Sequence, residues 1–213
     1  MPIRFLISAG PTREPIDPVR FISNPSSGKM GFALASAAKA AGHAVRLVCG
    51  PTCLDLPNAD EVVRVTTAAQ MRDAVVERLD DCDVLIMAAA VADFRPKRRS
   101  ANKIKKTDGA PVIELERTAD ILAEAALTKG NRVHVGFAAE TSDVVENARS
   151  KLEAKNLDLV VANDLTEEGA GFGTETNRAT LLWRDGRVEA LPMMAKRALA
   201  EYIIDAVAEL YGD

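Results

Sequence analysis

Residues 24–31 of the chain, NPSSGKMG, combine small side chains, two hydroxyl groups and a lysine just before an alanine-rich segment typical of a helix. Ser26 and Ser27 are favourable N-cap residues for that helix. The unpaired N–H groups and the positive dipole end of a helix attract anions. Together with Gly28 and Lys29, these serines predict a contact with a phosphate or carboxylate group.

The segment lacks the spacing of two well-known glycine-rich phosphate loops. A Walker A loop requires G-x4-G-K-[ST], whereas Ser23 occupies the first glycine position and Met30 follows Gly28-Lys29. The G-x-G-x-x-G pattern is also absent, because only Gly28 and Gly31 have a suitable spacing. From the residues alone, a general anion site and a plain capped helix start are both compatible with this segment.

A strongly basic segment, residues 97–106 (KRRSANKIKK), has six basic residues and no acid. Such a segment is often a solvated surface loop. The alternative is a flexible arm that closes over a polyphosphate, in which a lysine supplies a point charge that follows developing negative charge. In that reading Ile104, which lies between lysines, gives the arm an apolar contact.

Two further segments follow apolar strands. Asp93, in AAAVADF, is either a turn residue or a group facing a nucleotide and its Mg²⁺, an ion that prefers one or two carboxylates plus phosphate oxygens. Phe137 and Ala138 lie in GFAAET, where exposed backbone groups could distinguish one base from another. Phe137 is also compatible with core packing.

The remaining polar segments set limits on the chemistry. Asn163-Asp164 and the glycine-rich residues 169–177 are either turns, a lid or a subunit contact. His43 and His134 lie in or beside predicted strands, so no nucleophile-and-base set is evident. Phosphate-binding residues, a lysine arm and no general base suit nucleotidyl or phosphoryl transfer, in which an enzyme mainly positions groups and neutralises charge.

The elements that position these residues alternate between strand and helix, which predicts an α/β fold. We expect a Rossmann-like three-layer domain with a mostly parallel sheet, as a single domain over residues 1–213. Asp185-Gly186 predicts a late antiparallel hairpin, and prolines at 11, 15, 18 and 25 predict a long loop. The predicted strands are 4–8, 44–48, 62–65, 83–87, 112–115, 133–138, 158–162, 180–183 and 187–191. The predicted helices are 32–41, 68–79, 120–127, 143–155 and 194–210.

The candidate site residues should meet at one edge of the sheet. Ligands of parallel sheets bind beyond the carboxyl ends of the strands. The unusual loops follow the predicted strands that end at Ser8, Val48, Met87, Ala138 and Ala162. We therefore expect one site at that edge.

Composition limits the class of protein. The chain has 213 residues and a net charge of −4, which disfavours a general nucleic-acid partner. Three cysteines and two histidines favour neither a disulfide framework nor a zinc site. The N-terminal apolar run is too short for a signal peptide, and no stretch approaches the ~18 apolar residues of a membrane span. We expect a cytoplasmic protein without membrane contact.

Five blocks together resemble the phosphopantothenoylcysteine synthetase family, which joins 4′-phosphopantothenate to cysteine in coenzyme A biosynthesis. The blocks are SAGPTREPIDPVRFISNPSSGKMG, AAAVADF, NKIKK, GFAAET and VAND with the later GFG and Asn177. The first is the most specific, and together they extend over nearly the whole chain. The resemblance concerns the synthetase part alone, which in many bacteria is fused behind a flavin-dependent decarboxylase. The chain is then either free-standing or one half of such a protein, and a decarboxylase is a possible partner.

The resemblance implies a two-step ligase reaction. The carboxylate of 4′-phosphopantothenate attacks the α-phosphate of CTP and releases pyrophosphate. The amine of L-cysteine then attacks the acyl-cytidylate, and CMP leaves. NKIKK and AAAVADF resemble the bacterial, CTP-dependent branch rather than the branch that tends to use ATP. Mg²⁺ would be bound to the triphosphate, and the family's dimers imply a homodimer with phosphopantothenate near the subunit boundary.

The resemblance also assigns roles by position. Asn24 would hold the phosphopantothenate carboxylate and the acyl intermediate, Arg20 would organise its loop, and Lys103 would neutralise charge as the acyl-cytidylate forms. Asp93 would be the residue near the metal. The expected nucleotide-binding residues are Gly10, Ser26, Ser27, Gly28, Lys29, Ala90, Asp93, Phe137, Ala138, Lys105 and Lys106. One departure is Ala119, where the family often has proline.

Two other functions are compatible with such a sheet. The first is a dinucleotide-binding oxidoreductase, which the missing G-x-G-x-x-G and the absence of an acid near Cys49 at the end of the second strand disfavour. The second is a nucleotide sensor without catalysis, which the presence of both Asn24 and Lys103 disfavours.

Overall fold

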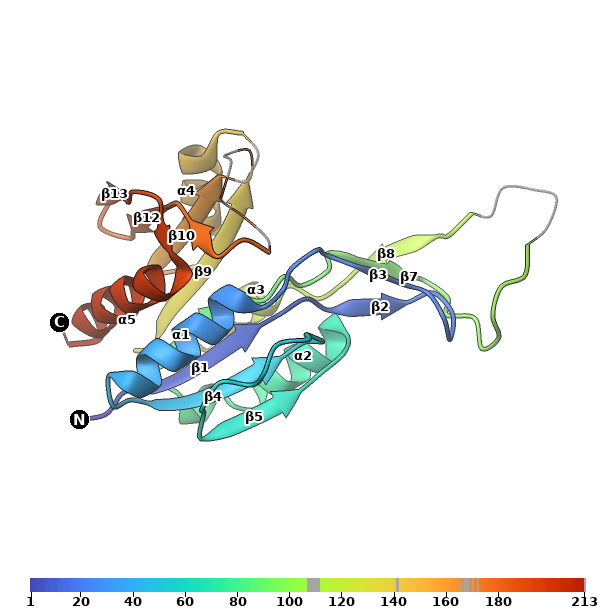
Figure 1. Ribbon diagram of the computed structural model, residues 1–213, viewed down its shortest axis with the longest axis horizontal. Coiled ribbons are helices and arrows are strands. Elements are labelled where there is room, and N and C mark those ends of the chain that lie inside the picture. The colour runs from blue at the N-terminus through green and yellow to red at the C-terminus, as the bar shows by residue number, and fades with distance from the viewer. Residues whose placement is uncertain are drawn as a thin grey trace.

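The computed structural model of the chain describes residues 1–212 apart from residues 107–111, 141, 165, 167, 168, 170 and 172. Its centre is an eight-stranded sheet with the order β13-β12-β10-β9-β6-β1-β4-β5 (Figure 1). The strands of this sheet are β1 (Arg4–Ala9), β4 (Ala44–Cys49), β5 (Glu61–Arg64), β6 (Val84–Met87), β9 (Val133–Glu140), β10 (Leu159–Asp164), β12 (Ala179–Trp183) and β13 (Val188–Ala190).

The six neighbouring strands β5, β4, β1, β6, β9 and β10 are parallel. β12 and β13 add an antiparallel hairpin beside β10. Numbered along the chain, the parallel strands lie in the order 3-2-1-4-5-6, which is that of doubly wound nucleotide-binding folds. The strand order reverses between β1 and β6, and ligands of such sheets bind beyond the carboxyl ends at that point. The predicted α/β fold with a late hairpin is confirmed.

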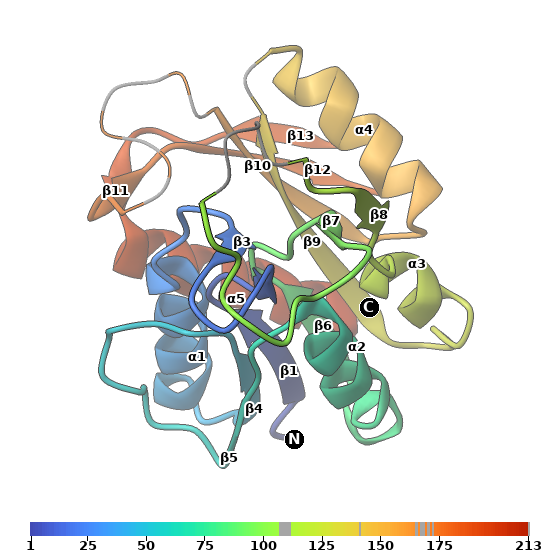
Figure 2. The ribbon, with the colours of Figure 1, turned by 90° about the vertical axis from the view of Figure 1, so that its right-hand side faces the viewer.

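Helices cover both faces of the sheet, as Figure 2 shows. One face carries α1 and α5, and the other carries α2, α3 and α4. On β1, Phe5 and Ile7 are buried under α1 and α5, whereas Leu6 is buried on the opposite face, because successive strand residues point to opposite sides. None of the described helices is both long and apolar enough to cross a membrane. The helices are α1 (Lys29–Ala40), α2 (Ala68–Val76), η1 (Leu79–Asp81, a 3-10 turn), α3 (Ile121–Ala126), α4 (Val144–Ala154) and α5 (Lys196–Gly212).

The start of α1 differs from the prediction. Its N-cap is Gly28, with φ 85°, and neither serine before it caps the helix. The hydroxyls of Ser26 and Ser27 accept only long bonds of 3.4 Å from the N–H groups of Gly28 and Lys29. A left-handed residue turns the chain into the helix here, and glycine adopts that conformation without strain. The serines therefore belong to the loop that precedes α1.

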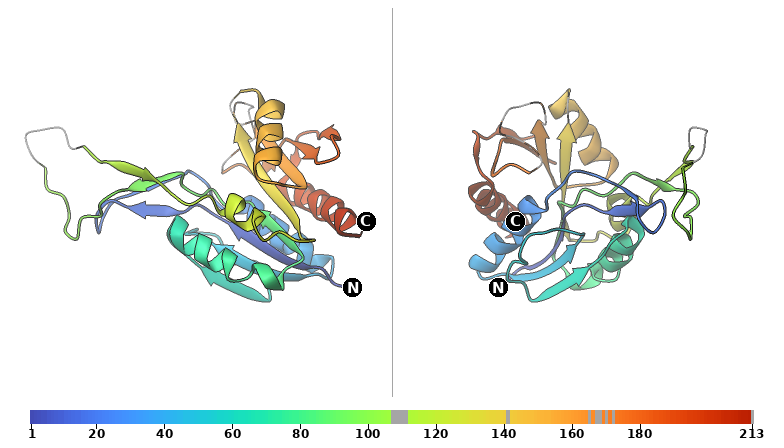
Figure 3. Two further views of the ribbon diagram at one scale, coloured as in Figure 1. Left: turned by 180° about the vertical axis from the view of Figure 1, so that it is seen from behind. Right: turned by 45° about the vertical axis from the view of Figure 1, so that its right-hand side comes forward.

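Two antiparallel ribbons project from the carboxyl edge of the sheet (Figures 1 and 3). β2 (Arg13–Pro15) pairs with β3 (Phe21–Ser23), and β7 (Phe94–Pro96) pairs with β8 (Leu115–Arg117). The predicted long loop is therefore wrong over β2 and β3. Pro15 is tolerated because it ends an edge strand, where its missing N–H removes no ladder bond from a central strand. The strand predicted at 112–115 is displaced to β8.

The basic segment 97–106 leaves β7 and runs to the outer end of the projection formed by these ribbons, whereas both chain termini lie at the opposite end of the molecule (Figure 1). A third short ribbon pairs β11 (Thr176–Asn177) with β14 (Met194–Ala195) beside the start of α5. The first two residues of the predicted last helix thus belong to a strand.

Candidate active site

A cleft of about 1060 Å³ opens at the carboxyl edge of the sheet, beside the point where the strand order reverses. Its walls come from the start of α1, the segment after β6, the start of α3, the end of β9 and α4. This volume is slightly above the range of about 300–1,000 Å³ for small-molecule sites. The predicted site residues that line it are Asn24, Ser26, Ser27, Gly28, Lys29, Ala90, Asp93, Phe137 and Ala138.

Asn24 is fixed by the segment that follows β6. Its side-chain Nδ2 donates to the backbone oxygens of Ala90 (3.2 Å) and Val91 (3.1 Å). A primary amide has two N–H donors, so both are used by the protein. The atom left for a ligand in the cleft is therefore Oδ1, which is an acceptor.

Glycines allow α1 to approach β1 closely. A Cβ on Gly31 would lie 2.5 Å from the Cβ of Ala9, and a Cβ on Gly28 would lie 3.3 Å from the Cα of Gly10. Gly10, a predicted nucleotide contact, thus lies beneath the start of α1 and does not line the cleft. In this structure its contribution is the space that it leaves for Gly28.

Residues 88–93 form an extended wall that two threonines hold in place. Thr12 donates its N–H to the oxygen of Ala90 (3.2 Å), and its hydroxyl accepts from the N–H of Ala92 (3.0 Å). The hydroxyl of Thr118 donates to the oxygen of Ala92 (2.6 Å), and its N–H donates to the oxygen of Asp93 (2.9 Å). The side chain of Asp93 remains exposed at the cleft.

The opposite wall contributes two lysines that the sequence analysis missed. Lys151 on α4 donates to the backbone oxygen of Phe137, and burial lowers its pKa. Lys155, one helical turn later, pairs with Asp120, the N-cap of α3. Burial alone would raise the pKa of Asp120, but the Lys155 ammonium group and the N–H of Ala123 hold that pKa below its ordinary value. The available signal was the spacing of four residues between two lysines in the predicted helix.

Two further lysines hold part of the glycine-rich segment near the start of α1. Lys196 is buried, and its Nζ donates to the oxygens of Gly171 (2.9 Å) and Thr174 (2.7 Å). Burial lowers the pKa of Lys196, and the nearby Lys29 ammonium group lowers it further. Lys29 in turn pairs with Glu175 at 2.6 Å. Sequence analysis missed Lys196 because no motif surrounds it.

Residues 163–177 border the cleft, although the structure describes them only in part. Gly171, Gly173, Asn163 and Asn177 line the cleft, and Asn177 donates from Nδ2 to Oδ1 of Asn163 at 3.0 Å. Residues 141, 165, 167, 168, 170 and 172, together with the side chain at position 164, lie outside the described part of the chain. The choice between turn, lid and subunit contact for this segment stays open.

The cleft carries more positive than negative side chains, although the whole chain has a net charge of −4. Its described lining holds five cations, Lys29, Arg117, Lys151, Lys155 and Lys196, and two acids, Asp93 and Asp120. A concave surface of one sign focuses the electrostatic field and raises the local concentration of ligands of opposite charge. The cleft therefore suits a polyanion.

The basic arm and Arg20 do not line this cleft. Lys103, Lys105 and Lys106 are exposed at the outer end of the projection. Arg20 pairs with Asp17 at 2.5 Å and donates to the backbone oxygen of Ile104 at 2.7 Å. Arg20 thus organises the arm as well as its own turn, and the arm runs to the outer end of the projection, away from the central sheet (Figure 1).

A metal ion in this cleft would need phosphate oxygens. Among the described residues, no group of three or more His, Cys, Asp or Glu side chains is arranged to hold a metal. Asp93 is an exposed carboxylate at the cleft, which fits an ion that takes one carboxylate and phosphate oxygens from its ligand.

The model of one protein family, described as the DNA/pantothenate metabolism flavoprotein C-terminal domain, matches residues 2–211. The chain belongs to this family. The match includes every element that lines the cleft. Membership in this family does not favour the oxidoreductase alternative. The structure does not favour it either, because the ribbon between β1 and α1 replaces the short glycine turn that a dinucleotide requires.

Named relatives of the same family support this assignment. The chain is 50% identical to the coenzyme A biosynthesis bifunctional protein CoaBC of Bacillus subtilis (strain 168) over 206 residues, which are 96% of this chain and 51% of that protein. It superposes on the crystal structure of the C-terminal domain of CoaBC with a TM-score of 0.84 and 43% identity, covering 99% of this chain and 97% of that domain. A Cab2 mutant in complex with phosphopantothenate-cysteine has the same fold, with a TM-score of 0.78 and 19% identity over 99% of this chain and 86% of Cab2. The chain spans about half the length of the curated relatives that it matches.

Proposed function

We propose that this chain is a phosphopantothenate–cysteine ligase that uses CTP and forms an acyl-cytidylate intermediate. The observation that carries the proposal is a cation-rich cleft, bordered by Asn24 and the start of α1, in a chain similar over its length to the C-terminal domain of CoaBC. A mutant of Cab2, which shares the fold, has a solved structure in complex with phosphopantothenate-cysteine, the product of such a reaction. That likeness concerns the fold alone, so the proposal depends on the cleft and on CoaBC.

In the first step, a carboxylate oxygen of phosphopantothenate bonds to the α-phosphorus of CTP, and the bond to the β-phosphate breaks. Negative charge grows on the departing pyrophosphate. The N–H groups at the start of α1 and the ammonium groups of Lys29 and Lys196 lie on one side of the cleft to stabilise it. Lys29 is bound to Glu175 and would exchange that partner for a phosphate.

In the second step, the cysteine nitrogen attacks the acyl carbon, CMP leaves with the bonding electrons, and the nitrogen loses a proton. Nothing in the described cleft is an evident strong base, which agrees with an activated acyl phosphate that needs little further activation. Asn24 offers Oδ1 at this place. An acceptor there suits an incoming N–H group better than a carboxylate, so we propose that Asn24 receives the cysteine amine beside the acyl group.

The nucleotide would lie between Ala90, Asp93, Phe137 and Ala138, with Mg²⁺ bound to its triphosphate and to Asp93. When bound, this ion would withdraw charge from the phosphate oxygens and orient them for in-line displacement. Lys151 and Lys155 would neutralise the ligand from the α4 side. Backbone groups at the end of β9 would read the base edge, and the NKIKK and AAAVADF segments support CTP over ATP.

A direct assay tests the proposal. The protein is mixed with 4′-phosphopantothenate, L-cysteine and Mg²⁺, and with CTP, ATP, GTP or UTP in turn. We expect pyrophosphate and CMP with CTP, together with a product that has the mass of phosphopantothenoylcysteine. Pyrophosphate release that needs no phosphopantothenate would contradict the proposal, as would no release with any nucleotide. Hydride transfer from NADH or NADPH would favour the oxidoreductase instead.

Lys103 would supply the mobile charge for the first step, although its arm runs to the outer end of the projection (Figure 1). We expect Lys103→Gln to slow acyl-cytidylate formation about 10²-fold or more, because one neutralising group is lost from the transition state, with CTP affinity largely kept. Single-turnover pyrophosphate release measures the rate, and CTP titration measures the affinity. Release at the parent rate would remove Lys103 from the mechanism.

The proposed homodimer allows the arm to act on the cleft of the second copy. Mixing Lys103→Gln and Asn24→Asp chains tests this, because a mixed dimer then holds one cleft with Asn24 and an intact arm from its partner. Random mixing of the two chains makes half of the dimers mixed, and each mixed dimer has one working cleft of two if the arms cross between subunits. Crossing arms would therefore restore about a quarter of the parent activity, whereas arms that fold back would restore none. A flavin-dependent decarboxylase, fused or separate, is the further partner that the bifunctional relatives support.

A further inference from the structure

Asp17 is a buried carboxylate in the turn between β2 and β3, at the outer end of the projection, where few other side chains are buried. Its Oδ1 accepts from the N–H groups of Val19 (2.8 Å) and Arg20 (2.9 Å). Its Oδ2 accepts from the Arg20 guanidinium group (2.5 and 3.0 Å) and from the N–H of Ile104 (3.1 Å). One carboxylate thus gathers the turn, the arginine and the basic arm.

Arg20 completes the grip on the arm. Nη2 of Arg20, one of the two guanidinium nitrogens that contact Asp17, also donates to the backbone oxygen of Ile104 at 2.7 Å. Both backbone groups of Ile104 are therefore bound, one by each member of the Asp17–Arg20 pair. A third contact joins the N–H of Ser100 to the oxygen of Ile16 at 2.9 Å. We call this set of contacts the arm clasp.

The arm clasp acts on the residue next to Lys103. Holding the N–H and the C=O of one residue fixes the direction in which the chain enters and leaves it, because the backbone has only two soft dihedral angles per residue. The clasp therefore sets where the Cα of Lys103 stands, while its long side chain stays free and exposed. When the backbone of a lysine is fixed, its ammonium group can still move on the flexible side chain. It then loses less conformational freedom when it binds a ligand.

The carboxylate itself is suited to this task. Burial alone would raise the pKa of Asp17, but the Arg20 guanidinium group and the surrounding N–H groups hold that pKa far below its ordinary value. Asp17 is thus ionised at neutral pH. A neutral amide in its place could accept at only one of these two oxygen positions, so its NH2 group would face the donors at the other.

We propose that Asp17, acting with Arg20 through the backbone of Ile104, is the positioning residue for Lys103 in the ligase reaction. This inference rests on the proposed function. It assigns Asp17 no contact with substrate, and it extends the role of Arg20 from organising its own loop to organising the arm. If it is correct, a variant that lacks the clasp should show the same kinetic defect as a variant that lacks the Lys103 ammonium group.

Asp17→Asn, Lys103→Gln and the double variant test the inference by a mutant cycle. We expect Asp17→Asn to slow pyrophosphate release in the absence of cysteine by about 10-fold or more, with the KM for CTP changed less than about 2-fold. Because both variants remove the same contribution, the double variant should be no slower than Lys103→Gln alone. Capture of preformed acyl-cytidylate by cysteine should keep the parent rate in all three.

Two further variants separate positioning from general damage. Arg20→Gln leaves Asp17 in place and changes an exposed side chain, so the protein should fold, and we expect a smaller decrease in the same step. Glu116→Gln is the matched control, because it breaks the exposed Arg95–Glu116 pair (2.8 Å) on the neighbouring ribbon without contacting the arm. It should leave pyrophosphate release unchanged. Multiplicative losses in the double variant, or a parent rate in Asp17→Asn, would overturn the inference.

Limited trypsin digestion of the full chain gives a readout that does not depend on activity. Cleavage after Lys103, Lys105 and Lys106 should be several-fold faster in Asp17→Asn than in the parent, because the release of Ile104 frees the backbone, with Glu116→Gln like the parent. Equal cleavage of Asp17→Asn and parent would overturn the clasp. A parent protein that releases no pyrophosphate would instead contradict the proposed function, and the digestion would still test the clasp.

Discussion

At the scale of single residues, the surroundings of a side chain decide what it can offer to a ligand. Asn24 is at the position that sequence reasoning chose, yet its amide nitrogen is already used by two backbone oxygens. Its free atom is an acceptor rather than a donor. Residue type and position were therefore predictable, whereas the available atom was not, because it depends on a segment more than sixty residues away in the chain.

Asn24→Asp should remove most of the proposed ligase activity. The new carboxylate would face the oxygens of Ala90 and Val91, which offer it no proton, and it would lie beside the substrate carboxylate. We expect a loss of product formation of roughly 10²-fold, measured by the appearance of phosphopantothenoylcysteine. Asn147→Asp, an exposed change on α4, is the control. Unaltered product formation by the Asn24 variant would show that the residue is outside the mechanism.

His134 makes the fold sensitive to acid. It is fully buried in β9, and neither ring nitrogen has a hydrogen-bond partner among the described residues. Burial, assisted by the Lys129 ammonium group, lowers its pKa from 6.5 to about 4. The unfolded chain therefore takes up the proton first. The stability linked to neutral His134 is complete above pH 6.5 and decreases as the pH falls from 6.5 toward 4, by on the order of 3 kcal/mol in total.

His134→Leu should abolish this part of the pH dependence. We expect the free energy of unfolding of the variant, measured in urea, to fall less than that of the parent between pH 7.5 and pH 4.5, since no buried group there must take up a proton. His43→Leu is the comparison, because His43 is only half-buried and its Nδ1 accepts from the N–H of Ile3 at 3.3 Å. Parallel pH profiles for the parent and His134→Leu would contradict the assignment.

At the scale of elements, the central sheet and its helices were predictable, and the ribbons were not. β1, β4 and β6 are apolar runs bounded by turn residues, and this pattern alone indicates a buried parallel sheet. Each ribbon strand buries at most one residue, so the ribbon sequences carry no regular alternation of apolar and polar residues. Pro15 and Pro96 also weaken the strand signal, although both are tolerated in edge strands.

The contact between α1 and β1 links packing to the site. Gly31→Ala would place a methyl group 2.5 Å from the Cβ of Ala9, which requires α1 to move away from the sheet. We expect a loss of about 1–3 kcal/mol in the free energy of unfolding, as for other overpacked cores. Because the start of α1 lines the cleft, CTP affinity should also fall, which calorimetry can measure.

Gly42→Ala is the matched control at the other end of the same helix. No atom would meet its Cβ, but its φ of 84° strains any other residue, so stability should fall by about 1 kcal/mol. CTP affinity should stay at the parent value, since Gly42 is remote from the cleft. A decrease in CTP affinity in both variants, in proportion to their loss of stability, would contradict the prediction that the position of α1 determines CTP binding.

At the scale of the whole molecule, charge and shape are distributed unevenly. An acidic chain concentrates cations in one cleft, and these come from α1, β8, α4 and α5. Lys151 and Lys196 carry no motif, and tertiary structure alone brings them to the site that the recognised blocks define. This explains why sequence reasoning located the cleft but missed the cations that α4 and α5 contribute to it.

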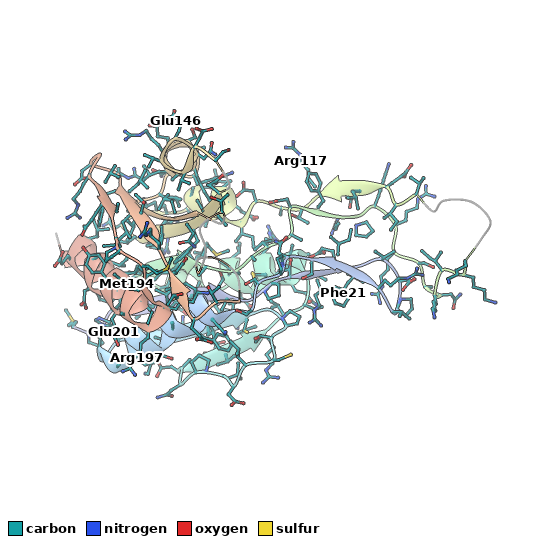
Figure 4. The ribbon with its side chains drawn as sticks, turned by 45° about the horizontal axis from the view of Figure 1, so that its top comes forward. Phe21, Arg117, Glu146, Met194, Arg197 and Glu201 are labelled. Carbon is teal, nitrogen blue, oxygen red and sulfur yellow. The ribbon has the colours of Figure 1, made fainter. Side chains whose placement is uncertain are left out.

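The projecting ribbons leave apolar side chains in solvent. Figure 4 shows Phe21 on this projection, and 47% of its surface is exposed, as is 47% of Leu115 on β8. Val19, Val112 and Ile113 add further exposed apolar surface to the same end of the molecule. Monomeric proteins rarely present such a patch without a function, and a second copy of the chain is the partner that we propose to cover it.

Phe21→Asp combined with Leu115→Asp should therefore prevent association. We expect the parent to sediment with a mass near twice 22.8 kDa and the double variant to sediment near 22.8 kDa, because two charges would otherwise be buried in an apolar contact. Leu127→Asp is the control, since Leu127 is 84% exposed after α3, away from the ribbons. A monomeric parent, or a double variant that remains a dimer, would show that the ribbons do not form the interface. If the arms cross between subunits, the double variant should also lose activity with its cleft intact, and high protein concentration should partly restore it by mass action.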